Sequence, residues 1–224
     1  LFKWPEELMF IKNGRAVQKT SDEMMKGLTC IISGSSSGVG KVTLRRFAEA
    51  GANLVMVVRN KEKAVKVKEE ILQDFNVQID IVIADFSDFD SVKTAAETIL
   101  EKYPKIDVLV NSAGIHSTKR TYNKDGIEMV FCVNHLSTFL FTYLLLDRIK
   151  ASAPARIIQV NSEGHRFGSV KLNDVNWKKH IYTGLRSYGA SKTAQLYTVY
   201  ELAERLKGSG VTINAMHPGA VKTN

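Results

Sequence analysis

The stretch Leu28-Thr29-Cys30-Ile31-Ile32-Ser33-Gly34-Ser35-Ser36-Ser37-Gly38-Val39-Gly40 decides the fold of this chain. An apolar run typical of a buried strand leads directly into a glycine- and serine-rich turn, and an amphipathic segment from Lys41 to Ala50 follows at once. A strand, a glycine turn and the start of a helix together present outward-pointing backbone N–H groups, and the helix dipole favours a negative charge there. The sequence therefore predicts a phosphate-binding turn.

Three glycines give this turn its expected shape. Gly34 and Gly38 can take backbone angles that are closed to other residues, and Gly40 lets the helix approach the strand closely. Their spacing, Gly-x3-Gly-x-Gly, differs from the Gly-x-Gly-x-x-Gly of the standard dinucleotide-binding pattern. Taken alone, the turn is equally compatible with a serine- and glycine-rich loop that only joins two elements.

The rest of the chain alternates strand-like and helix-like segments. The strand-like runs are nearly continuously apolar and rich in Val and Ile, as expected of parallel strands covered on both faces. We predict strands at Leu28–Ser33, Asn53–Val58, Gln78–Ala84, Ile106–Val110, Ala155–Val160 and Val211–Met216, and helices near 38–50, 61–75, 88–103, 126–151 and 184–207. This alternation predicts an α/β fold, namely a Rossmann-type doubly wound parallel sheet with helices on both faces.

The length of 224 residues and the hydrophobic content of 44% suit one α/β domain with a sizeable core. We divide the chain into an N-terminal extension, residues 1–26, and one α/β domain, residues 27–224. The first residue is Leu rather than Met, so we expect the sequence to be a piece of a longer chain.

The net charge of +8 comes from scattered basic residues, without an arginine-rich arm or zinc-finger spacing, and this disfavours nucleic-acid binding. An anionic cofactor or an acidic membrane surface would both account for the excess. Cys30 and Cys132 lie in apolar runs, which indicates buried free thiols and a reducing intracellular compartment, in the cytoplasm or on a cytoplasmic membrane face. The five histidines show no ligand spacing, so we expect no metal site. The apolar run from Phe139 to Leu146 is too short to span a bilayer.

Tyr188 and Lys192 stand four apart in Ser-Tyr-Gly-Ala-Ser-Lys. On the predicted helix this spacing puts the phenol and the ammonium on one face, one turn apart. An ammonium beside a phenol favours the phenolate and lowers the tyrosine pKa, which makes the phenol a usable acid and base. The pair alone is common on solvated helices, so it acquires meaning only together with the glycine turn.

With these motifs in order, residues 27–224 resemble the short-chain dehydrogenase/reductase family, which implies that they form a dinucleotide-binding catalytic domain. The family's motifs are matched, from the N-terminus onward, by Ser33–Gly40, Asp85, Asn111–Gly114, Asn134, Ser162, Tyr188 with Lys192, and Pro218-Gly219. Two residues depart from the family pattern: Ser33 replaces Thr, and Ser112 replaces an Asn whose amide helps to tie neighbouring strands. The run from Asn161 to Phe167 and the long loop after it are most similar to the retinol-dehydrogenase-like branch.

The resemblance implies an oxidoreductase that transfers a hydride between a nicotinamide cofactor and a carbonyl or alcohol substrate. Ser162 and Tyr188 would donate hydrogen bonds to the carbonyl oxygen, and Tyr188 would act as general acid or base. Lys192 would also bind the nicotinamide ribose, and Asn134 would hold a water that links Lys192 to solvent. A dinucleotide-binding sensor without turnover, or an isomerase or epimerase on the same scaffold, stays an alternative. Members of the family usually continue with another strand beyond Pro-Gly, so the resemblance also implies that the C-terminal end of the domain is missing. A homodimer is compatible with the resemblance.

We expect NADP(H) as the cofactor, because Val58 stands where an NAD-specific relative has an acid and Arg59 can meet a 2′-phosphate. Ser35 and Ser36 could add hydroxyl donors, and Asp85 would hydrogen-bond the adenine. The expected cofactor-binding residues are Gly34, Ser35, Ser36, Ser37, Gly38, Val39, Gly40, Arg59, Asn60, Asp85, Phe86, Asn111, Ala113, Gly114, Tyr188, Lys192, Pro218, Gly219, Val221 and Thr223.

The segment Glu163–Arg186, called here the substrate wall, connects the predicted catalytic Ser162 to Tyr188. A connection of this length without clear periodicity is typical of a functional lid, so we expect a mobile wall over a lipophilic carbonyl substrate. The aromatic and apolar residues expected to supply that surface are Phe167, Val170, Leu172, Trp177, Ile181 and Tyr182. The alternative is that they pack on the body of the domain. Basic residues of the wall, Arg166, Lys171, Lys178 and Lys179, would also allow contact with a membrane surface.

Overall fold

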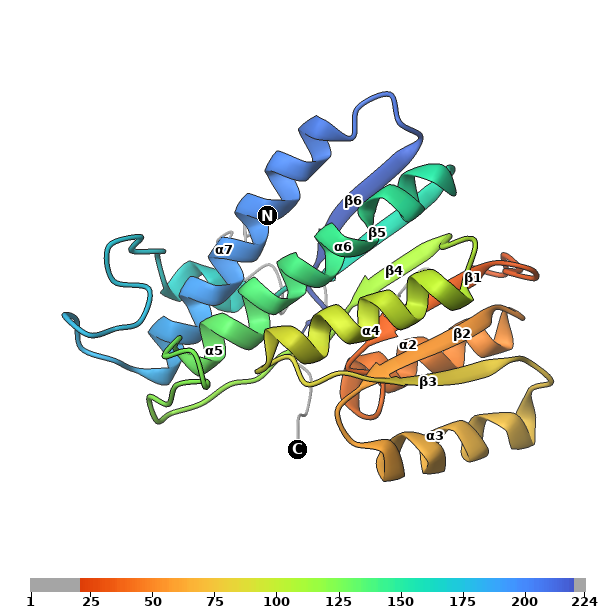
Figure 1. Ribbon diagram of the computed structural model, residues 1–224, viewed down its shortest axis with the longest axis horizontal. Helices are drawn as coiled ribbons and strands as arrows, with labels where there is room; N and C mark the ends of the chain where they lie inside the picture. The colour runs from red at the N-terminus through yellow and green to blue at the C-terminus, as the bar shows by residue number, and fades with distance from the viewer. Residues whose placement is uncertain (1–20, 220–224) are drawn as a thin grey trace, which may run out of the picture.

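The computed structural model describes residues 21–219, which form one parallel sheet covered by helices on both faces (Figure 1). The strands are β1 (Thr29–Ser33), β2 (Asn53–Val58), β3 (Ile79–Ile83), β4 (Val108–Asn111), β5 (Ala155–Val160) and β6 (Val211–Met216). Their order in the sheet is β3-β2-β1-β4-β5-β6, and every neighbouring pair is parallel. This order confirms the doubly wound fold and puts the reversal of strand order between β1 and β4.

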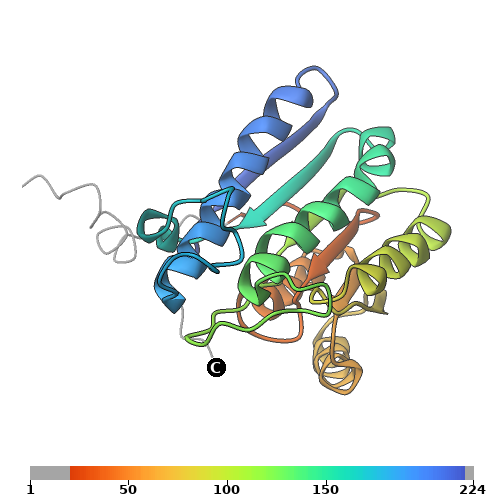
Figure 2. The same cartoon turned by 60° about the vertical axis from the view of Figure 1, so that its left-hand side comes forward.

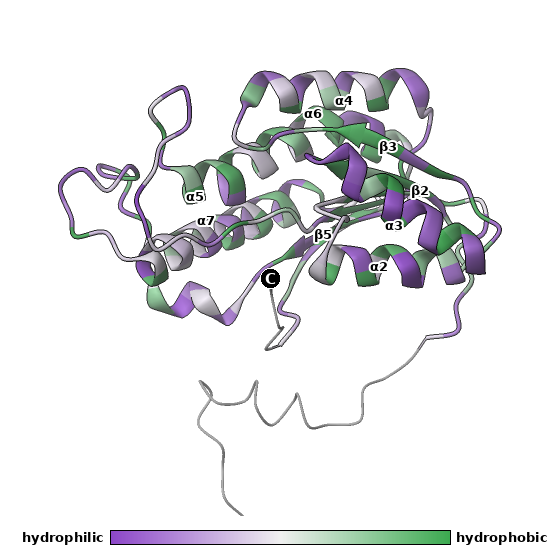
Figure 3. Cartoon of the chain, turned by 90° about the horizontal axis from the view of Figure 1, so that it is seen from below, coloured by the Kyte–Doolittle hydropathy of each residue, from purple (hydrophilic) through white to green (hydrophobic). Residues whose placement is uncertain are grey.

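The helices lie in two layers. Their bounds are α2 (Gly38–Glu49), α3 (Lys61–Asp74), α4 (Phe89–Lys102), α5 (Met129–Phe131), a π-helical turn η2 (Cys132–Leu136), α6 (Ser137–Ala151), a 3-10 turn η3 (Glu163–Phe167) and α7 (Gly184–Arg205). Buried residues of α2 and α3 form one core cluster with the sheet, and those of α4, α6 and α7 form another. Figure 3 shows the sheet between α4 and α6 on one side and α2 on the other.

The apolar strands supply both clusters because successive side chains point to opposite faces of the sheet. In β1, Ile31 packs under α4, α6 and α7, whereas Cys30 and Ile32 pack against α2 and α3. This double burial explains why the strands are near-continuous apolar runs instead of alternating ones.

Short polar caps fix where the helices begin. The side chain of Asn60 accepts a hydrogen bond from Lys63 N at 2.8 Å and caps α3, and Asp88 accepts one from Asp90 N at 2.9 Å and caps α4. Such caps satisfy backbone donors that lack partners inside the helix. The predicted helix bounds are therefore close to the observed ones at these two positions.

The helix predicted over 126–151 differs at its start and is interrupted. It begins at Met129, because the side chain of Glu128 caps its first turn, and the π-helical turn η2 separates α5 from α6. By length and composition Met129–Ala151 could cross a membrane, but 56% of the tested part of this helix is buried inside the fold. Figure 2 shows α6 beside α4 over the sheet, as expected of a core helix.

The two longest connections, residues 112–128 and the substrate wall, project from the end of the fold where β4 and β5 end (Figures 1 and 2). The wall contains one short element that its sequence did not suggest, the 3-10 turn η3 at Glu163–Phe167. Its last three residues belong to α7, as the predicted helix near 184–207 requires. Most of the predicted extension, together with Val221 and Thr223, lies outside the described residues.

Candidate active site

The turn after β1 meets the end of β4. Gly34 has φ +68°, and a Cβ at this position would lie 2.7 Å from Ala113 Cα. The hydroxyl of Ser33 accepts hydrogen bonds from Ser112 N and Ala113 N, both at 3.1 Å. These contacts join β1 and β4 at the switch in strand order, where doubly wound folds bind their ligands.

The other two glycines behave as predicted. Gly38 has φ +53°, and a Cβ on Gly40 would lie 2.5 Å from Gly34 O. Ser37, the N-cap of α2, makes no side-chain cap hydrogen bond, and the first turn of α2 holds no acidic residue. Among residues 21–219, no side chain accepts from the first N–H groups of α2, which fits a phosphate of a dinucleotide.

Two of the expected cofactor residues are limited by their own packing. Ser35 is fully buried and donates its hydroxyl to Ile32 O at 3.0 Å, so this hydroxyl is not the free donor that the sequence suggested. Phe86 is buried and packs edge-to-face on Phe141, with ring centroids 5.7 Å apart. The side chain of Phe86 therefore offers little surface to a cofactor.

The residues expected around the adenosine lie at the ends of β2 and β3. Arg59 is exposed directly after β2, and among residues 21–219 it makes no ion pair. The neighbouring Asn60 uses its side-chain oxygen to cap α3. Asp85 accepts hydrogen bonds from Ser87 N at 2.9 Å and Ser87 Oγ at 2.7 Å through one carboxylate oxygen, which leaves the other oxygen for a ligand.

Lys192 lies at the floor of the site, on α7. It is 4% exposed, and its ammonium donates to Val160 O at 3.0 Å. Burial lowers the pKa of Lys192 to about 8. Its Nζ lies 5.6 Å from the centroid of the Tyr188 ring and 3.9 Å from where a Cβ on Gly114 would be. The helix thus holds the predicted pair together on one face and next to the end of β4.

Ser162 and Tyr188 meet across Gly164. The Ser162 hydroxyl accepts a hydrogen bond from Gly164 N at 3.0 Å, which begins η3. A Cβ on Gly164 would lie 2.8 Å from Tyr188 Cε1 and 3.2 Å from Ser162 Oγ. A hydroxyl that accepts from the backbone keeps its own proton for another acceptor. The two predicted donors to a carbonyl oxygen therefore flank one glycine.

Asn134 occupies the π-helical turn and is fully buried. Its amide nitrogen donates to Ile115 O at 2.9 Å and to Ser191 Oγ at 3.0 Å, and its oxygen accepts from Ile115 N at 2.7 Å. These bonds fasten the segment after β4 to α7 beside Lys192. The expected water between Asn134 and Lys192 stays a prediction.

Two residues at the site were not predicted. The His116 ring packs edge-to-face on the Tyr188 ring, with centroids 5.6 Å apart, and Gly164 lies between Ser162 and Tyr188. His116 comes two residues after the Asn111–Gly114 motif, so its closeness to a predicted motif was the one available signal. Nothing local marked Gly164.

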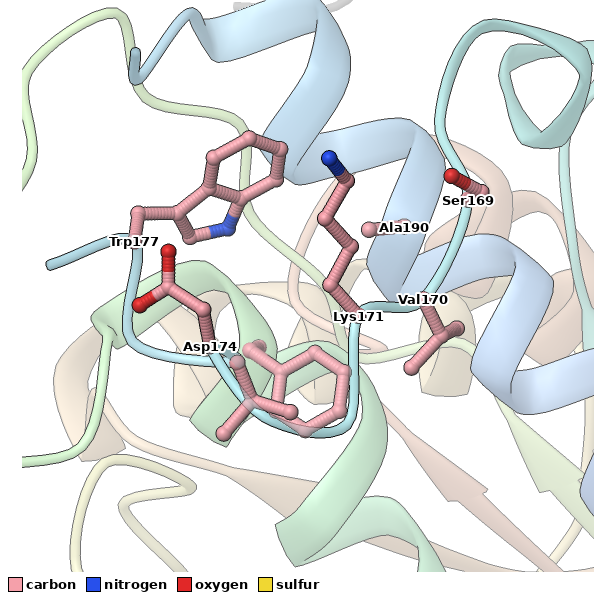
Figure 4. A pocket seen from close by; sticks show the side chains of 8 residues that line it. Ser169, Val170, Lys171, Asp174, Trp177 and Ala190 are labelled. Carbon is pink, nitrogen blue, oxygen red and sulfur yellow. The ribbon is translucent and has the colours of Figure 1, made fainter. Parts of the chain in front are cut away.

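Some apolar residues of the substrate wall pack on the body of the domain, and others are exposed. Trp177 is 7% exposed, and it encloses with Val170, Phe131 and Ala190 a small cavity of about 10 Å³, the size of a single water (Figure 4). By contrast, Leu172 and Ile181 are 88% and 77% exposed. The inner residues of the wall therefore pack on the body of the domain, and its outer apolar residues face outward.

The cysteines and the possible metal ligands suggest no second site in the described residues. Cys30 and Cys132 are free and buried, and burial raises the pKa of both thiols. Within residues 21–219, no group of three or more His, Cys, Asp or Glu side chains is arranged to hold a metal ion.

Comparisons with known proteins point to one family. A family model described as short chain dehydrogenase matches residues 28–224. Retinol dehydrogenase 13 of Homo sapiens is 38% identical over 204 residues, which cover 91% of this chain and 62% of the relative. The chain therefore spans less than two thirds of the length of this relative.

Solved structures show the same fold. A protein from Mycobacterium paratuberculosis is 33% identical with a TM-score of 0.76, over 88% of this chain and 69% of that one. A metagenomic short-chain oxidoreductase, solved in complex with NADP, has a TM-score of 0.73 at 23% identity, over 89% of this chain and 85% of that one.

Proposed function

The chain belongs to the short-chain dehydrogenase family, and on this premise we propose that it transfers a hydride between NADP(H) and an apolar carbonyl or alcohol substrate. The observation that carries the proposal is the arrangement of Ser162 and Tyr188 around Gly164, with Lys192 buried below them. A protein that only binds a dinucleotide has no use for a proton donor at this place.

Ser162, Tyr188 and Lys192 have separate roles in this reaction. Ser162 and Tyr188 hydrogen-bond the substrate oxygen and stabilise the negative charge that develops on it. Tyr188 gives its proton to that oxygen during reduction and removes one during oxidation. Lys192 lies next to the Tyr188 ring, so its ammonium favours the phenolate left behind.

The cofactor, when bound, supplies the hydride, and the chain supplies its binding site and orientation. The α2 N-terminus, with Gly34, Gly38 and Gly40, would hold the pyrophosphate, while Asp85 and the 111–114 segment would line the adenosine side. Arg59, exposed after β2, would meet a 2′-phosphate and so favour NADP(H) over NAD(H).

The substrate class is inferred from the wall and from the relatives. The apolar wall residues and the retinol dehydrogenase relative support a lipophilic carbonyl or alcohol. The two buried free cysteines support a reducing compartment.

Turnover of NADPH and NADH with a panel of aldehydes and ketones, from propanal to long-chain and polyene aldehydes, tests the proposal. We expect turnover that is faster with NADPH and with the apolar aldehydes. Tight cofactor binding without any turnover would favour the sensor alternative. Product formation without net cofactor consumption would favour an isomerase or epimerase.

A further inference from the structure

Glu128 is a fully buried carboxylate at the start of the helix that leads to Asn134. Its two oxygens accept hydrogen bonds from Val130 N at 3.0 Å and Phe131 N at 2.8 Å. No lysine, arginine or histidine within residues 21–219 forms an ion pair with it. Backbone and hydroxyl donors therefore compensate the burial of this acid.

The substrate wall is fastened to the same residue. Glu128 N donates to Asn176 Oδ1 at 2.9 Å. The Tyr182 hydroxyl lies 3.3 Å from Glu128 Oε1 and 3.1 Å from Ser117 O, so its proton is shared between the two acceptors. Tyr182 in turn packs edge-to-face on Trp177, a buried residue of the wall, with ring centroids 6.0 Å apart.

Glu128 also contacts the helix that carries the proton donor. Ser187 is 1% exposed and donates its hydroxyl to Glu128 Oε2 at 3.2 Å. Ser187 directly precedes Tyr188 in α7. One carboxylate therefore contacts the start of α5, the end of the wall and the residue beside Tyr188.

A carboxylate suits this position because it accepts hydrogen bonds in every direction and donates none. An amide of the same shape would turn an NH₂ group toward one pair of donors, either Val130 N with Tyr182 Oη or Phe131 N with Ser187 Oγ. Such a clash leaves buried donors without an acceptor.

We propose that Glu128 is a positioning residue, which holds the substrate wall closed through Tyr182 and aligns Tyr188 through Ser187. The proposal rests on the oxidoreductase function proposed above. Two separate effects follow: release of the Tyr182 contact weakens substrate binding, and release of the Ser187 contact disturbs the reacting geometry.

The test compares Glu128→Gln, Tyr182→Phe, Ser187→Ala and the double variant Glu128→Gln/Tyr182→Phe. Hydrogen–deuterium exchange of the peptide covering residues 169–183 reports on the wall without any need for activity. We expect exchange about tenfold faster in Glu128→Gln, about threefold faster in Tyr182→Phe, and no faster in the double variant than in Glu128→Gln.

Steady-state kinetics with NADPH and decanal give the second readout. Tyr182→Phe should raise KM about threefold at constant kcat, Ser187→Ala should lower kcat about threefold at constant KM, and Glu128→Gln should change both about tenfold. A purely structural role would change both constants in every variant.

Asp88→Asn is the matched control, since Asp88 also caps a helix with its carboxylate but does not contact the wall. This variant should behave as wild type.

Wall exchange that is the same in Glu128→Gln and wild type would overturn the proposal, and so would additive exchange effects in the double variant. If Glu128→Gln does not fold, the two single variants still decide it: the proposal requires that Tyr182→Phe changes only KM and that Ser187→Ala changes only kcat. A wild-type protein without carbonyl turnover would instead contradict the proposed function, and the exchange results would then decide the role of Glu128 alone.

Discussion

The cofactor side of the site and the substrate wall differ in how tightly their residues are packed. On the cofactor side, the turn after β1 and the end of β4 meet backbone to backbone, so that Gly34 lies too close to Ala113 to allow a Cβ. On the substrate side, the two ends of the wall also meet the backbone of the body, because a Cβ on Gly184 would lie 2.6 Å from Ser117 O and one on Gly168 would collide with Ala190 N. Between these ends, single side chains such as Tyr182, which contacts Glu128, join the wall to the body, and Leu172 stays 88% exposed. The cofactor side therefore tolerates little change, whereas the exposed middle of the substrate wall can vary in sequence.

The largest effect is expected where the two sides meet. Tyr188→Phe keeps the ring that packs on Gly164 and His116 but removes the proton donor. We expect turnover to fall by about 10²–10⁴-fold, the usual contribution of a general acid, with NADPH affinity and melting temperature nearly unchanged. Steady-state rates and fluorescence titration with NADPH measure both. Lys192→Ala, in comparison, should reduce turnover and cofactor affinity together, and a Tyr188→Phe protein with most of its activity would refute the assignment.

Gly34→Ala tests the cofactor side by itself. The new methyl group would meet the Ala113 backbone at 2.7 Å, and the residue would keep φ +68°. We expect a loss of about 2–4 kcal/mol in the free energy of unfolding, measured by urea denaturation, and weaker NADPH binding. Leu172→Ala in the wall should change stability by less than about 0.5 kcal/mol. Equal losses in the two variants would contradict the contrast between the two sides.

Arg59→Ala tests whether the cofactor side selects NADP(H) over NAD(H). The exposed guanidinium makes no ion pair within residues 21–219, so its loss should leave stability unchanged. NADP⁺ binding should weaken by about 1.5–3 kcal/mol, the range for charged hydrogen bonds, while NAD⁺ binding stays the same. Isothermal titration calorimetry with both cofactors provides the measurement. Equal affinity of the wild type for NAD⁺ and NADP⁺ would refute the proposed preference.

Lys192 links the two sides and should make stability depend on pH. Burial lowers its pKa to about 8, whereas an unfolded lysine titrates near 10.4. Between these values the unfolded chain binds more protons, so the free energy of unfolding rises with pH. From pH 7.5 to 10 we expect the wild type to gain on the order of 2 kcal/mol relative to Lys192→Met in urea denaturation. A constant difference between the two proteins would contradict a depressed lysine pKa.

The contrast also explains what the sequence could predict. Gly34, Gly38 and Gly40 act within one turn, and Tyr188 and Lys192 lie on one helical face, so their spacing alone predicts where they lie. Strands that are buried on both faces are continuous apolar runs in the sequence, so these runs and the helical segments between them predict the doubly wound sheet.

The remaining features depend on contacts between distant segments. His116 reaches Tyr188, and Glu128 reaches Tyr182 and Ser187, only because the sheet brings the ends of β4 and β5 together. The Ser35 hydroxyl was misjudged for a related reason: its bond to Ile32 O depends on how the turn closes, which composition does not reveal.

The central claim is that the protein transfers a hydride from NADPH to a carbonyl substrate. NADPH that carries deuterium at the nicotinamide C4 position tests this claim most directly. The protein is incubated with this cofactor, labelled in turn on each face, and with decanal, and the alcohol is analysed by mass spectrometry. The account predicts one deuterium per alcohol from one labelled face, none from the other, and almost no alcohol with Tyr188→Phe. NADPH that binds or is oxidised without deuterium reaching any alcohol would contradict it.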